Sequence, residues 1–105
     1  MSSIESVGVV HDLLGRASYL AMQDEGFDPR LGLVVSTLAL KSMTLLDGST
    51  LPTLPLLLPE TVMECLAEAH RLVQSWQLVD LPKSAIGFVR ELAEVHDAVS
   101  ALGRA

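Results

Sequence analysis

The chain has 105 residues, half of them hydrophobic, and a formal net charge of −6 at pH 7. This length supports one domain, residues 1–105, around one hydrophobic core. The hydrophobic content excludes intrinsic disorder, and the single cysteine excludes a disulfide scaffold. The net negative charge argues against binding to nucleic acids or anionic membranes, because such binding depends on clustered Lys and Arg.

The first predicted helix spans about 3–25. Ser2 and Glu5 have the spacing of a capping box, and Gly26 is expected to end the helix in a left-handed conformation. Apolar residues recur at helical spacing between these signals. They are Val7, Val10, Leu14, Ala17 and Ala21.

The second predicted helix spans about 29–46. Asp28 can accept hydrogen bonds from free backbone N–H groups, and Pro29 has the backbone angle of a first helical turn. Asp47 and Gly48 are expected to end this helix.

A connector and a third helix follow. Residues 49–58 contain two prolines and no charge, which excludes a helix and predicts an apolar connector. Pro59 or Thr61 then begins a helix over about 60–78, with Thr61 and Glu64 forming a second capping box.

The fourth predicted helix spans about 81–102, with Asp80 as its N-cap and Pro82 in its first turn. Short links place successive helices antiparallel, so the pattern predicts an all-α, four-helix bundle made of two helical hairpins joined by the proline-bearing connector. The order of the helices around the bundle stays open.

The second helix carries more apolar surface than one side of a bundle helix can bury, because its polar stripe is a single narrow line. Either the connector 49–58 covers the surplus, or a second subunit does; we favour a homodimer, the common form of self-association. Gly32 and Ser36 would let a partner backbone approach closely. The expected interface residues are Leu31, Gly32, Leu33, Val35, Ser36, Leu38, Leu40 and Met43.

Few residues have the spacing of a known chemical site. No metal-binding motif, glycine-rich phosphate loop or serine nucleophile elbow occurs, so we expect no metal and no cofactor. Cys65 is expected to be a buried thiol, and the neighbouring Glu64 disfavours its thiolate. His11 and His70 are expected at solvated helix edges.

His96 is the most distinctive titratable residue, because it falls on the apolar side of the fourth helix. Buried histidines usually have a hydrogen-bond partner and stay neutral. An alternative function is therefore a small-molecule-binding bundle, with an apolar pocket near His96, Phe88 and Trp76.

Arg90 and His96, with five residues between them, suggest a further alternative. Their spacing resembles the Arg-x(4–6)-His signature of the HEPN ribonucleases, helical bundles that assemble a composite site across a dimer. The resemblance implies that Arg90 and His96 would serve RNA cleavage. The sequence departs from the family pattern after His96, where Asp97 and Ala98 replace the aromatic residue often found there.

These patterns predict a non-enzymatic accessory or interaction protein that self-associates through its second helix, with another protein as the alternative partner. Residues 1–5 lack the features of a signal peptide and no apolar run is long enough to span a membrane, so we expect a cytoplasmic location. The absence of asparagine, with only two lysines and two isoleucines, is typical of a bacterial gene rich in G and C.

Overall fold

The computed structural model describes residues 3–45, 60–77, 79, 81 and 83–103. Their fold is all-α with four packed helices, as predicted. The helices are α1 (Ser3–Gln23), α2 (Pro29–Leu45), α3 (Val62–Val73) and α4 (Ser84–Gly103).

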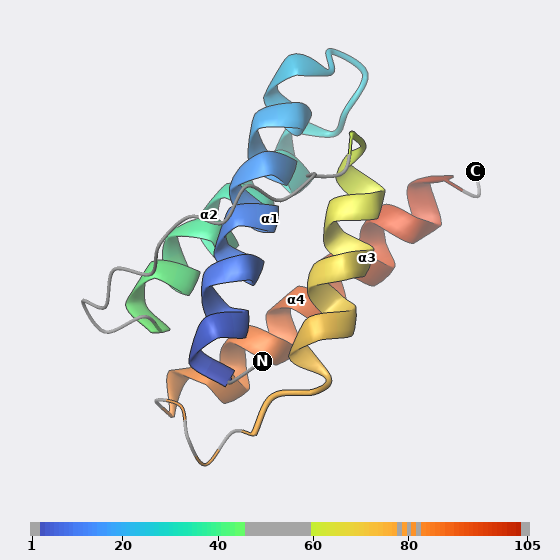
Figure 1. The fold of residues 1–105 in the computed structure, drawn as a ribbon. Helices are drawn as coiled ribbons and strands as arrows, with labels where there is room; N and C mark the ends of the chain where they lie inside the picture. Colours follow the sequence, from blue (N-terminus) through green and yellow to red (C-terminus); the bar gives the residue numbers. More distant parts are fainter. Residues whose placement is uncertain (1–2, 46–59, 78, 80, 82, 104–105) are drawn as a thin grey trace.

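The helices form two layers, with α1 and α3 in front of α2 and α4 in the view of Figure 1. α1 packs against α2 and α3, and α4 packs against the same two helices, so α1 and α4 lie diagonally across the bundle. This arrangement supplies the helix order that the sequence leaves open. It also gives α2 a free side, away from α1 and α4.

The core lies between the two layers and takes residues from all four helices. Each helix contributes an apolar stripe at helical spacing, as expected for amphipathic helices that bury one face. The side chains with almost no exposed surface include Val7, Val10, Leu14, Val35, Leu38, Leu45, Leu66 and Leu92.

Capping side chains define the ends of α1, α2 and α3. Asp28 Oδ1 accepts from the Arg30 backbone N–H (2.8 Å), and Thr61 Oγ1 accepts from the Glu64 backbone N–H (3.1 Å), which confirms both predicted helix starts. The predicted end of the first helix is wrong. α1 stops at Gln23, and Asp24 Oδ1 accepts from the Gly26 N–H (2.9 Å) in a local turn in which Gly26 is not left-handed.

The third helix is shorter than predicted, because it ends at Val73 and not near residue 78. The N–H groups of Ser75 and Trp76 donate to the carbonyl oxygens three residues earlier, as in a 3₁₀ turn. The α-helical pattern of bonds to the fourth residue therefore ends here. Trp76 then turns inward, and its indole Nε1–H donates to Ser6 Oγ at 2.8 Å. This buried tertiary bond overrides the helical periodicity of the sequence.

The fourth helix begins at Ser84, three residues later than predicted. The proposed cap Asp80, Pro82, the connector 49–58 and Ser2 lie outside the described residues. Among the residues that the structure does describe, no helix is both long enough and apolar enough to cross a membrane.

Candidate interaction surface

One flank of α2 faces the core, which corrects two of the expected interface residues. Val35 is fully buried and Leu38 is 1% exposed, so neither is accessible to a partner. Leu31 is half-buried and packs against the same core. These residues hold α2 in the bundle, as an inward apolar stripe does.

The small residues of α2 also face the molecule's own α1. A Cβ at Gly32 would lie 3.8 Å from the Ala21 Cβ and from a ring carbon of Phe27. Ser36 Oγ is hydrogen-bonded to Ser18 Oγ of α1 at 2.6 Å. The predicted close approach at Gly32 and Ser36 is therefore made within one subunit.

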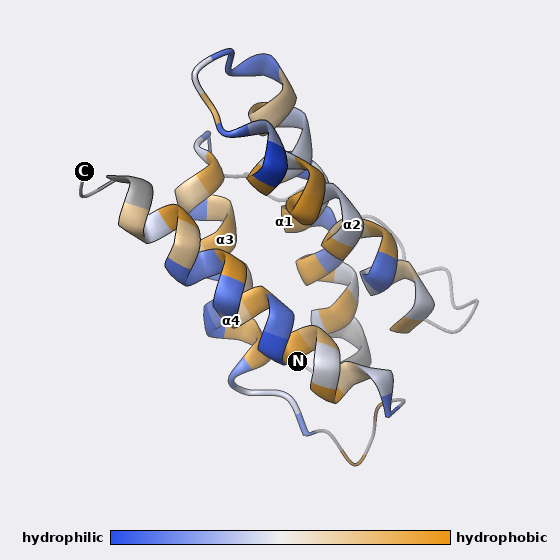
Figure 2. Cartoon of the chain, turned by 180° about the vertical axis from the view of Figure 1, so that it is seen from behind, coloured by the Kyte–Doolittle hydropathy of each residue, from blue (hydrophilic) through white to orange (hydrophobic). Residues whose placement is uncertain are grey.

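The opposite flank of α2 is apolar and exposed. Leu33 is 69% exposed, Leu40 is 66% exposed and Met43 is 54% exposed. Residues 33, 40 and 43 share one side of a helix, because seven residues complete nearly two turns. Figure 2 shows that hydrophobic segments recur along α2.

The adjoining side of α1 extends this exposed apolar flank. Met22, which is 80% exposed, lines the same shallow pocket as Leu33. Gly15 lies seven residues before Met22, on the same side of α1, and is also exposed. We define the α1–α2 outer face as Gly15, Met22, Leu33, Leu40 and Met43; none of its members is charged.

Polar contacts fix how α2 is rotated and how far it is shifted along α1. His11 Nδ1 lies 2.6 Å from Ser42 Oγ and 3.1 Å from the Ala39 carbonyl oxygen. His11 was expected to be solvated, so this contact between helices is a correction. On the other edge of α2, Lys41 Nζ bonds to Glu91 of α4 at 2.7 Å.

His96 is only partly buried and stacks on His70, which the sequence placed at a solvated edge. The two rings are 4.6 Å apart between centroids and 11° from parallel. His96 Nδ1 is buried and has no hydrogen-bond partner among the described residues, contrary to expectation, although Asp97 Oδ1 lies 3.5 Å away. The stack joins α3 to α4 through ring packing.

Trp76 and Phe88, the other two residues of the predicted ligand pocket, pack against each other. Their ring centroids are 5.9 Å apart and their planes are 12° from parallel. Both are buried members of the core, 8% and 3% exposed. The structure therefore joins Trp76 to Phe88, while His96 pairs with His70 on α3.

Arg90 and His96 do not meet. Six residues along an α-helix correspond to 600°, so the two side chains point about 120° apart. Arg90 is exposed and lies 3.5 Å from Glu94 Oε1, whereas His96 faces α3. The structure places the two residues on different sides of α4.

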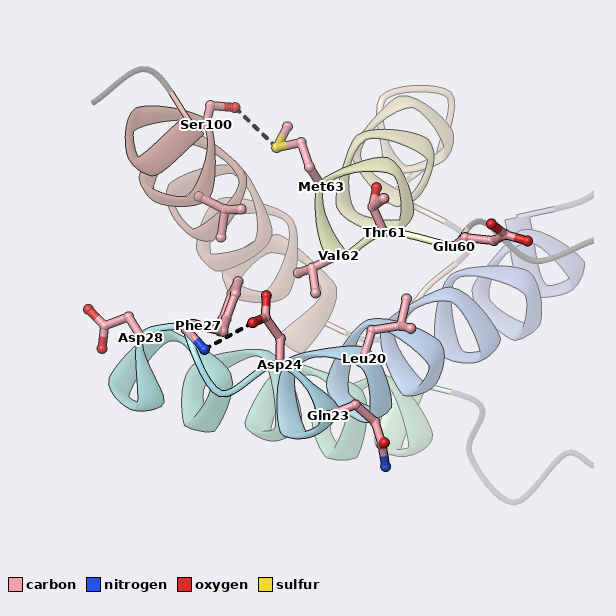
Figure 3. A pocket seen from close by; sticks show the side chains of 12 residues that line it. Leu20, Gln23, Asp24, Phe27, Asp28, Glu60, Thr61, Val62, Met63 and Ser100 are labelled. Carbon is pink, nitrogen blue, oxygen red and sulfur yellow. Dashed lines mark hydrogen bonds between the residues drawn. The ribbon is translucent and has the colours of Figure 1, made fainter.

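A separate open pocket of about 960 Å³ lies at the end of the bundle where the α1–α2 turn meets the start of α3 (Figure 3). Leu20, Phe27 and Val62 contribute apolar surface to it. The carboxylate of Asp24 points into the pocket, while Glu60 points away. None of the predicted pocket residues lines this space.

Cys65 is buried in α3, as predicted. Burial raises the pKa of the Cys65 thiol; Arg16 opposes this shift and Glu64 adds to it. Within the described part of the chain, no three His, Cys, Asp or Glu side chains lie close enough together to hold a metal ion.

Comparison with protein-family models, with curated proteins and with solved structures finds no match for this chain. Sequence reasoning missed Gly15 and Met22 as parts of the surface. Gly15 and Met22 are seven residues apart, and this spacing, which places them on one side of a helix, was the signal that the sequence contained.

Proposed function

We propose that this chain is a non-enzymatic interaction protein that forms a homodimer through the α1–α2 outer face. The observation that carries the proposal is the row of exposed apolar side chains on α2, formed by Leu33, Leu40 and Met43. A monomer gains nothing from exposing such a row to water, whereas a partner of complementary shape would bury it.

The size of the face predicts weak association. A helix of 17 residues is about 25 Å long, and two helices packed 8–10 Å apart present a strip roughly 18 Å wide. The strip covers about 450 Å² per subunit, below the ~800 Å² per partner of a standard interface. We therefore expect a dissociation constant in the micromolar range or weaker.

Charge has two effects on this face. Its five members are uncharged, so apposition of two copies would desolvate no charged group among them. Three carboxylates, those of Asp24, Glu25 and Asp28, nevertheless line the pocket that joins Met22 to Leu33. Each subunit also carries a net charge of −6, and the two subunits repel at long range. Because salt screens that repulsion, dimerisation should strengthen as ionic strength rises.

The direct test compares wild type with Leu33→Glu and Leu40→Glu by sedimentation velocity, across protein concentrations from micromolar to millimolar. Ile86→Glu is the matched control, because Ile86 is 61% exposed and lies on α4, away from the face. We expect wild type and Ile86→Glu to dimerise with increasing concentration. Leu33→Glu and Leu40→Glu should remain monomeric with unchanged helical circular dichroism.

A wild-type chain that stays monomeric at the highest concentration would refute the proposal. So would Leu40→Glu that dimerises like wild type. Loss of stability in a monomeric Leu40→Glu, with the control unaffected, would instead indicate that another part of the same chain covers Leu40.

A further inference from the structure

We draw no further inference here: the strongest candidate, the open pocket where the α1–α2 turn meets the start of α3, carries nothing because the acidic side chains that line it, Asp24, Asp28 and Glu60, are not accompanied by any feature of the described residues that points to a ligand.

Discussion

The two flanks of α2 should respond in opposite ways to the same small change, Leu→Ala. Leu38 is 1% exposed and lies in the core, so truncating it removes buried methyl groups and leaves a cavity. That combination costs about 2–5 kcal/mol of unfolding free energy. Leu40 is 66% exposed, and its truncation should change the unfolding free energy of the monomer by about 0.5 kcal/mol or less.

The difference matters because a domain of this size is stable by only about 5–15 kcal/mol. Urea unfolding followed by circular dichroism measures the loss of unfolding free energy in each variant. The protein concentration should be low enough that the midpoint no longer depends on it. The m-value should stay constant across wild type and both variants. Equal losses in Leu38→Ala and Leu40→Ala, or a larger loss in Leu40→Ala, would show that the rotation of α2 described above is wrong.

Three further predictions concern the contacts that hold the bundle together, each measured by urea unfolding. Ser6→Ala should cost about 1–3 kcal/mol, because it leaves the buried indole N–H of Trp76 without an acceptor; an unchanged midpoint would contradict this role. Thr61→Ala should cost about 1 kcal/mol through loss of the α3 N-cap, whereas Thr37→Ala on the exposed side of α2 should cost less. Burial raises the pKa of Cys65, so the unfolded chain should lose its thiol proton first and stability should fall as pH rises above about 8.5; Cys65→Ala should lack this part of the slope.

The helix starts could be predicted because their signals are local. Asp28 and Thr61 each bond to a backbone N–H two or three residues away, and these contacts depend on no distant part of the chain. The end of the third helix could not be predicted in this way. Trp76 fits the helical spacing, but its bond partner Ser6 is 70 residues away in the sequence.

For the histidines too, local spacing predicts the side of the helix but not the contact with another helix. Sequence spacing placed His96 on an inward side of its helix, but it contained no signal for the stack with His70 of α3. A contact between two helices depends on their relative shift and rotation, and both follow from the packing of the whole core. For the same reason, the bond between His11 and Ser42 could not be anticipated.

The surplus of apolar residues on α2 was visible in the sequence, but the side left exposed was not. Turning α2 to bury Leu40 would bring Leu38 out of the core and would break the contact between His11 and Ser42. It would also pull Lys41 away from Glu91 on the opposite edge. These two polar contacts lie on different sides of the helix, so no single rotation preserves both while burying Leu40. The exposure of the outer flank is therefore specified by side chains of α1 and α4.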